Sequence, residues 1–108
     1  MKLAAEPYEL IASGKKTVEV RLYDEKRKQI SVGDTIEFFR LNANVSLTAK
    51  VVAVHRFDSF RELFASALFP KTGSGDLSET DAADTMYKYY TKEQESHFGV
   101  LGIEIVLI

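Results

Sequence analysis

The chain has 108 residues, enough for one hydrophobic core but too few for two, so we expect a single domain over residues 1–108. It contains no cysteine, which excludes disulfide partners, thiolate metal ligands and a thiol nucleophile, and which suits the cytoplasmic location that we expect. No apolar stretch approaches the roughly 20 residues that a membrane span requires, and charge and proline interrupt the first residues too early for a signal sequence.

Charge is distributed unevenly along the chain. The formal net charge of −2 argues against a strongly basic nucleic-acid-binding protein. However, residues 1–61 contain 11 of the 14 lysines and arginines against 8 acidic residues, whereas residues 62–108 contain 3 basic and 8 acidic residues. A molecule polarised in this way can present a locally positive cleft, although mixed surface charge that serves only solubility is an equal alternative.

The first elements are expected to be a short strand and a helix. Lys2 and Leu3 can pair at the edge of a sheet. A helix is predicted to start at Glu6-Pro7, because proline in the first turn lacks only a donor that the helix does not use. Gly14 occupies the position at which helices commonly end in a left-handed conformation. The helix should therefore end at a corner that leads directly into the next strand.

The strand after this corner is unusually rich in charge. Its apolar positions alternate with polar ones, with Val18, Val20 and Leu22 against Thr17, Glu19 and Arg21. Strict alternation would place Lys16 on the apolar face, away from Glu19. We therefore expect the strand to begin at Thr17, which leaves Lys16 free to turn from the corner into a cleft. A β-bulge that resets the alternation is the other explanation.

Two longer strands are predicted in the middle of the chain. Residues 23–29 are expected to form a solvated loop, whose consecutive cations Lys26 to Lys28 could alternatively contact phosphates. A strand over residues 35–41 leads through a short turn into a long strand over residues 45–57. The second half of this strand loses its alternation in the run Val51-Val52-Ala53-Val54, which predicts burial on both faces.

A helix and a glycine-rich loop are expected next. Asp58 or Ser59 can cap the helix, apolar residues follow at helical spacing, and Pro70 is expected to end it. The loop over residues 71–76 is predicted to be the most mobile segment. Its Gly73-Ser74-Gly75 sequence could cradle a phosphate, but no matching strand pattern precedes it.

Two short helices and a strand complete the chain. Ser78 with Asp81 resembles a capping box, and Thr91 begins a second box-like start. The nearly continuous apolar run of residues 100–108 is expected to form a central strand. The order of elements, with few parallel crossovers, indicates an α+β fold, a small and mostly antiparallel β-barrel with flanking helices.

The sequence carries no strong enzyme signature. It lacks a nucleophile elbow, a phosphate-binding loop of the Walker type and a dinucleotide fingerprint. His55 and His97 do not have the spacing of metal ligands, and His55 is expected to be a packed histidine at a strand end. We therefore predict neither a metal ion nor a cofactor.

Lys16, Glu19 and Arg21 form the strongest candidate site. A lysine in a partly dry cleft can act as a base, or remain charged and polarise a carbonyl group. A glutamate between cations can be held ionised or can accept a proton, and an arginine binds anions through two parallel hydrogen bonds. On chemistry alone, the alternative is a set of surface ion pairs without function.

The spacing Gly14-x-Lys16-x-x-Glu19-x-Arg21 resembles the signature Gly-x-Lys-x-x-Glu-x-Arg of the ASCH domain family. This family is similar in fold to the PUA domain, a small β-barrel associated with RNA. Residues 21–27, 32–36 and 99–104 also resemble the family, so the likeness covers nearly the whole chain. It implies a PUA-like barrel that binds RNA in a cleft beside the charged strand.

The resemblance carries over Lys16, Glu19 and Arg21 as cleft residues, and we add Lys15 and Arg40 as candidate ligand-binding cations. The first hypothesis is a module that binds RNA, a nucleotide or a nucleoside. In this hypothesis Lys16 and Arg21 contact phosphate or base, and Glu19 accepts a hydrogen bond from a base amino group.

The second hypothesis is a small hydrolase that acts on a modified nucleoside or on RNA. Some small bacterial members of the family deacylate N4-acetylcytidine with a lysine, a threonine and a glutamate. Lys16 matches that lysine, but Glu19 stands where the threonine is expected. Asp76 or Glu79 would be the further acid, with Lys16 and Glu19 as the acid–base pair. Because an acid replaces the nucleophile, the sequence favours binding or general-base chemistry over acyl transfer.

Three tyrosines near the end of the chain offer stacking surfaces if they face the cleft, namely Tyr87, Tyr89 and Tyr90. The helical spacing of Tyr87 and Tyr90 more simply assigns those two to the core.

Overall fold

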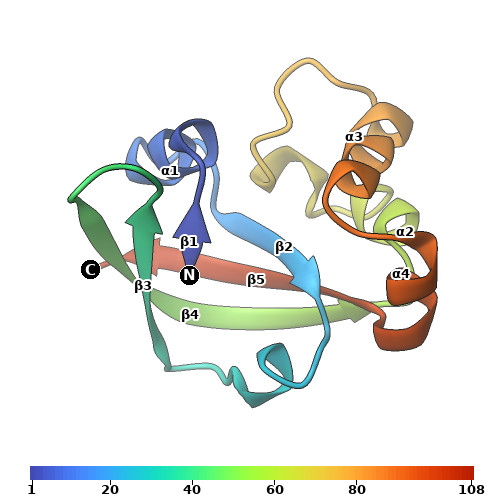
Figure 1. Cartoon of the computed structure of the whole chain (residues 1–108), viewed down its shortest axis with the longest axis horizontal. Coiled ribbons are helices and arrows are strands. Elements are labelled where there is room, and N and C mark those ends of the chain that lie inside the picture. Colours follow the sequence, from blue (N-terminus) through green and yellow to red (C-terminus); the bar gives the residue numbers. More distant parts are fainter.

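A strongly curved five-stranded sheet organises the molecule (Figure 1). The computed structural model describes residues 1–108. The strands are β1 (Lys2–Leu3), β2 (Val18–Leu22), β3 (Thr35–Arg40), β4 (Ser46–Phe57) and β5 (Val100–Leu107). They are ordered β1-β3-β4-β5-β2, and every neighbouring pair is antiparallel except the parallel pair β1–β3. The predicted α+β class and the mostly antiparallel, barrel-like sheet are confirmed, but the edge strands β1 and β2 do not pair with each other, so the sheet is a half-barrel.

The long strand β4 differs from its prediction in its second half. Val51 pairs with Ile105 and Ala53 with Glu104, so the register shifts and Val52 has no partner on β5. Val52 and Val54 are exposed, whereas Val51 is buried. The prediction that this run is buried on both faces is therefore wrong. Burial instead alternates through the run, with Val51 and Ala53 less exposed than Val52 and Val54, while a β-bulge at Val52 shifts the pairing with β5 by one residue.

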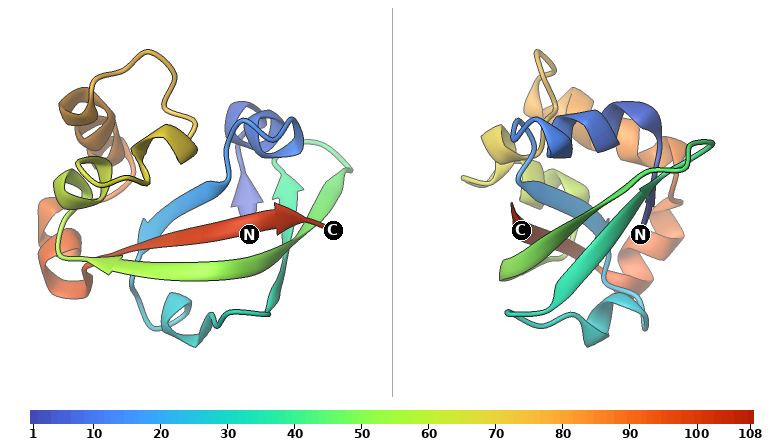
Figure 2. Two further views of the ribbon diagram at one scale, coloured as in Figure 1. Left: turned by 180° about the vertical axis from the view of Figure 1, so that it is seen from behind. Right: turned by 90° about the vertical axis from the view of Figure 1, so that its left-hand side faces the viewer.

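Four α-helices flank the sheet, namely α1 (Ala5–Ala12), α2 (Phe60–Phe64), α3 (Glu79–Thr85) and α4 (Lys92–Phe98). Short 3-10 turns lie at Arg27–Gln29, Phe69–Lys71 and Met86–Lys88. Figure 2 shows α2, α3 and α4 gathered at one end of the long β4–β5 pair, with α1 toward the other end. None of the helices has the length and apolar character needed to cross a membrane.

The helix ends follow local side-chain chemistry. Ser59, and not Asp58, caps α2 by accepting a hydrogen bond from the Glu62 N–H group. This helix ends at Phe64, six residues before the predicted stop at Pro70. The Ser66 hydroxyl donates to Leu63 O and accepts from the Leu68 N–H group, and these bonds replace the hydrogen bonds that would continue the helix.

The two later caps confirm the predicted helix starts. Ser78 caps α3 by accepting from the Asp81 N–H group, but the shorter Asp81 side chain makes no return bond. Thr91 and Gln94 form a complete capping box at the start of α4.

Strand β2 lies between two apolar clusters, and this position decides where its charged side chains point. Val18, Val20 and Leu22 belong to the cluster that packs against α2 and α3. On the opposite face, Glu19 and Arg21 lie beside Ile103 and Leu101 of β5, whose side chains belong to the core of the half-barrel. The charged face of β2 is therefore directed toward the open side of the half-barrel rather than toward bulk solvent.

Candidate functional site

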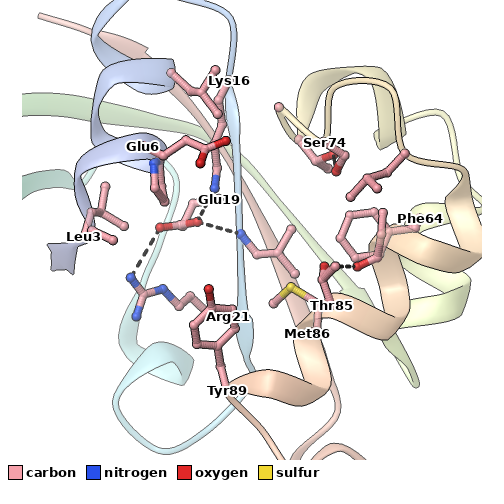
Figure 3. Close-up of a pocket in the computed structure, with 18 of the residues that line it drawn as sticks. Leu3, Glu6, Lys16, Glu19, Arg21, Phe64, Ser74, Thr85, Met86 and Tyr89 are labelled. Carbon is pink, nitrogen blue, oxygen red and sulfur yellow. Dashed lines mark hydrogen bonds and ion pairs between the residues drawn. The ribbon is translucent and has the colours of Figure 1, made fainter.

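A cleft of about 510 Å³ separates two walls of the molecule (Figure 3). One wall consists of β1, α1 and β2, and it carries Lys16, Glu19 and Arg21. The other consists of residues 72–77, part of α2 and the segment from α3 to Tyr90. The cleft therefore opens where the half-barrel is not closed by β1–β2 pairing, and the three residues singled out in the sequence meet there.

Glu19 is the centre of the first wall. Only 3% of the residue is exposed, and its carboxylate oxygens accept three contacts. Lys16 Nζ lies 2.9 Å from Oε1, the Val20 N–H group donates to Oε1 at 3.1 Å, and Arg21 Nη2 lies 3.3 Å from Oε2. A buried carboxylate needs such partners, because an unpaired charge in the interior is very costly. The side chains of Lys16 and Arg21 are 12% and 18% exposed, so they connect this buried charge to the cleft.

The pKa of Glu19 is lowered by its surroundings. Burial acts to raise this pKa, but the charges of Lys16 and Arg21 and the hydrogen bonds from Lys16 and the Val20 N–H group outweigh burial. The net pKa lies below the ordinary value of 4.5, so Glu19 is ionised at neutral pH. A carboxylate with a low pKa is a poor proton acceptor, and its ordinary role in such a cluster is to hold cations in place.

Stability should therefore fall on acidification in a way that depends on Glu19. Because its pKa is lower in the folded chain, its contribution is complete above about pH 4.5 and is lost as pH falls through the folded pKa. Urea unfolding across this acid range should show a steeper loss of stability for the wild type than for Glu19→Gln. Parallel curves for the two proteins would contradict this assignment.

Lys16 reaches the cleft from the corner between α1 and β2. Gly14 has φ +80°, as its position at a helix end predicts. The Lys16 N–H group bonds to Leu10 O at 3.0 Å, and the Thr17 N–H group bonds to Lys71 O at 2.9 Å. Strand β2 begins at Val18, one residue after the predicted start at Thr17, and pairs with β5 without a bulge. The expectation that Lys16 lies before the strand and is free of its alternation is thus confirmed.

Arg21 spans the gap between the two edge strands. Its Nη2 donates to Lys2 O on β1 at 3.2 Å, in addition to its contact with Glu19 on β2. The nearby N-terminal ammonium group of Met1 has a lowered pKa, first because of burial and then because of the charges of Arg21, Lys26 and Arg27. Positive charge is therefore concentrated around Arg21, beyond the cleft itself.

The second wall contains hydroxyl groups that the sequence did not assign to the site, together with Tyr89, one of the three tyrosines considered as stacking surfaces. Thr72, Ser74 and Thr85 line the cleft, and Tyr89, which is 75% exposed, lies at its edge (Figure 3). Only the glycine-rich character of residues 73–75 marked this loop in the sequence. The pattern did not indicate Thr72 or Thr85, because both can be explained as ordinary capping or surface residues.

Tyr90 also lines the cleft, but its ring stacks on Phe60 at 5.7 Å between centroids. Tyr87 contacts the same ring edge-on, and its hydroxyl donates to Glu95 at 2.8 Å. Burial, followed by this bond to Glu95, raises the pKa of Tyr87. The two rings are held by the core, which leaves Tyr89 as the tyrosine with a free face.

Gly73 lies at a point where the two walls approach each other closely. A Cβ atom at this position would lie 3.0 Å from Lys16 Cβ and 3.3 Å from Leu10 Cδ1, and its φ of +73° is rarely adopted by other residues. The loop can therefore approach the stem of Lys16 closely only because residue 73 has no side chain.

Four other candidate residues do not line the cleft. Lys15 is exposed, and Arg40 lies 3.8 Å from Glu9 in an exposed ion pair. Asp76 and Glu79, the candidates for a further acid, are exposed and also lie outside the cleft lining.

His55 is not the packed histidine that the sequence predicted. Its side chain is 37% exposed, and its Nε2 lies 2.7 Å from Glu104 Oε1. Glu104 also pairs with Lys71 at 3.6 Å. The polar partner was missed because β4 and β5 are far apart in sequence. No group of three or more His, Cys, Asp or Glu side chains is arranged to hold a metal ion.

Comparisons with known proteins agree with this architecture. The sequence matches the ASCH domain over residues 1–108. It is similar to the hypothetical protein PH0355, a crystal structure with 34% identity, full coverage of both chains and a TM-score of 0.84. It is also similar to protein PF0455 from Pyrococcus furiosus, an NMR structure with 32% identity, 100% and 98% coverage and a TM-score of 0.74.

More distant structures share the fold. The crystal structure of an ASCH protein from Zymomonas mobilis has 19% identity and a TM-score of 0.63, and the match covers 98% of this chain and 64% of that one. No curated protein matched the sequence.

Proposed function

Because this chain belongs to the ASCH domain family, we propose that its cleft binds RNA or a nucleotide, with Lys16 and Arg21 contacting the anionic part of the ligand. The observation that carries this proposal is the buried carboxylate of Glu19, which holds the two cations at the cleft. The resemblance to a family associated with RNA supports the choice of ligand.

The two cations retain donors for a ligand. An ammonium group has three N–H donors, and Lys16 uses one of them on Glu19. A guanidinium group has five, and the contacts of Arg21 with Glu19 and Lys2 O both involve Nη2. Glu19 by contrast already accepts from three groups. Its proposed role is therefore to position the cations, in place of the contact with a base that the sequence suggested.

The dimensions and charge of the cleft suit a small anionic ligand. Its volume of about 510 Å³ falls within the range of small-molecule sites. Three cations, Lys2, Lys16 and Arg21, and two carboxylates, Glu6 and Glu19, line it, which leaves one net positive charge. The exposed ring of Tyr89 at its edge provides a surface on which a base can stack.

Hydrolysis of a modified nucleoside has less support. The low pKa of Glu19 and its three contacts make it a poor general base. Neither Asp76 nor Glu79 lines the cleft. We therefore propose binding as the activity of this site.

Binding of a fluorescein-labelled single-stranded RNA of mixed sequence tests the proposal. We expect Lys16→Gln or Arg21→Gln to weaken binding about tenfold, because each removes one charge-assisted contact. With two phosphates neutralised, the logarithm of the association constant should fall with the logarithm of salt concentration with a slope of about −1.4, and of about −0.7 in either variant.

Lys50→Gln is the matched control, because Lys50 is an exposed lysine on β4 outside the cleft. Its affinity for the RNA should equal that of the wild type. The proposal is wrong if the RNA shows no salt-sensitive binding. It is also wrong if the double variant of Lys16 and Arg21, folded as judged by circular dichroism, binds as tightly as the wild type.

A further inference from the structure

The hydroxyl groups of Thr72, Ser74 and Thr85 on the second wall donate their protons to other groups of the protein. Thr72 Oγ1 lies 2.7 Å from Phe69 O and 2.7 Å from Ser74 Oγ. A carbonyl oxygen has no proton, so the single hydroxyl proton of Thr72 must be donated to Phe69 O. Ser74 is then the donor in its bond with Thr72. The oxygen of Ser74, which lines the cleft, therefore offers only lone pairs to a ligand.

The opposite arrangement of protons is strongly disfavoured. If Thr72 donated to Ser74, its oxygen would face Phe69 O at 2.7 Å with no proton between the two acceptors. Only 6% of Thr72 is exposed, so water has little access to relieve this contact. Opposed lone pairs are costly in such a low-dielectric position.

Thr85 repeats this arrangement on the same wall. Its Oγ1 donates to Ala82 O at 2.6 Å, so this hydroxyl also presents lone pairs to the cleft (Figure 3). On the facing wall Lys16 and Arg21 carry only donors, and the carboxylates of Glu6 and Glu19 lie on the same wall. The cleft thus has two cations with free donors on one wall and, on the other, the accepting hydroxyl oxygens of Ser74 and Thr85, which we call the acceptor wall.

Resting on the proposed function, we propose that the acceptor wall selects nucleotides whose base carries an exocyclic amino group, with Ser74 as the acceptor and Thr72 as its positioning residue. A nucleotide has its phosphate at one end and the edge of its base at the other. The proposal places the phosphate on Lys16 and Arg21 and the edge of the base against Ser74. Adenine, cytosine and guanine each present an amino group that can donate there.

Pairs of nucleotides that differ only in the amino group test this selection. Adenosine 5′-monophosphate is compared with purine riboside 5′-monophosphate, and cytidine 5′-monophosphate with its pyrimidin-2-one analogue, by isothermal titration calorimetry. We expect the wild type to bind the amino form of at least one pair about tenfold more tightly, because the analogue leaves Ser74 without a donor.

Two substitutions remove the selection in different ways. Ser74→Ala deletes the acceptor. Thr72→Val keeps the shape of the side chain but releases the Ser74 proton, so that Ser74 can donate as well as accept. In both variants the preference should fall to about twofold or less, whereas Thr72→Ser should retain it.

The matched controls remove the same groups on β4, outside the cleft, and are Ser46→Ala and Thr48→Val. Both should keep the wild-type preference. The readout is the ratio of the affinity for the amino nucleotide to the affinity for its analogue without the amino group, because a general loss of stability does not change this ratio.

The outcomes separate this inference from the proposed function. If neither member of either pair binds and the RNA does not bind, both fail. If nucleotides bind and Lys16→Gln weakens them, the proposed function holds. In that case a wild-type preference near one, or an undiminished preference in Thr72→Val, overturns the selection by Ser74.

Discussion

Replacing Glu19 with glutamine is expected to lower the free energy of unfolding by about 3 kcal/mol, the lower end of the range for breaking a buried ion pair. The substitution removes the charge that Lys16 and Arg21 share at 2.9 and 3.3 Å. Both cations then remain close together with little access to water. The lower end of the range applies because the side chains of Lys16 and Arg21 are still 12% and 18% exposed to solvent. Urea unfolding at neutral pH, followed by circular dichroism, measures the change.

Glu25→Gln provides the matched control, because Glu25 also pairs with a lysine three residues away, at 3.0 Å, but its side chain is 84% exposed. Its effect should be about 0.5 kcal/mol or less. Lys16→Met introduced into Glu19→Gln should restore part of the lost stability, since it removes one of the two uncompensated charges. Equal effects of Glu19→Gln and Glu25→Gln would show that the cluster is not a buried ion pair.

Substitution of Gly73 by alanine is expected to cost about 3 kcal/mol and to weaken ligand binding as well. An alanine must adopt φ +73°, which costs about 1 kcal/mol or more for a residue with a Cβ atom. Its Cβ would also lie 3.0 Å from Lys16 Cβ, so either the loop or Lys16 must move. Displacement of Lys16 alters its contact with Glu19 and the position of its free donors.

Gly75→Ala separates the two costs. Gly75 has φ +65°, but a Cβ atom there would meet nothing within 4 Å. This variant should therefore lose only the backbone contribution, about 1 kcal/mol, and bind RNA as the wild type does. Equal stability and equal affinity in the two alanine variants would show that the loop at Gly73 and the side chain of Lys16 are not in close contact.

Much of the fold could be predicted because its signals are local. The starts of α3 and α4 depend on Ser78 and Thr91, which bond to backbone groups three residues away. The corner at Gly14 requires only a positive φ. The spacing of Lys16, Glu19 and Arg21 also lies within one short segment. Such interactions join neighbours in the chain, so the residue types alone specify them.

Predictions failed where a distant segment decides the outcome. The run from Val51 to Val54 has the composition of a doubly buried strand, but the register with β5 places a bulge within it. His55 was expected to be packed, but Glu104 of β5 gives it a polar partner. Neither pairing can be derived from the local pattern, because about 50 residues separate the strands in the sequence.

The sequence by itself determined the family signature, the order of the elements and the identity of the three charged residues at the corner and on β2. Only the tertiary structure decided that Glu19 is buried, that the N-terminal strand places a carbonyl beside Arg21, and that Lys15 and Arg40 lie outside the cleft. It also supplied the acceptor wall of Ser74 and Thr85. The physical reason is that burial and proton direction depend on groups brought together by folding, whereas helix starts and strand alternation depend on neighbours along the chain.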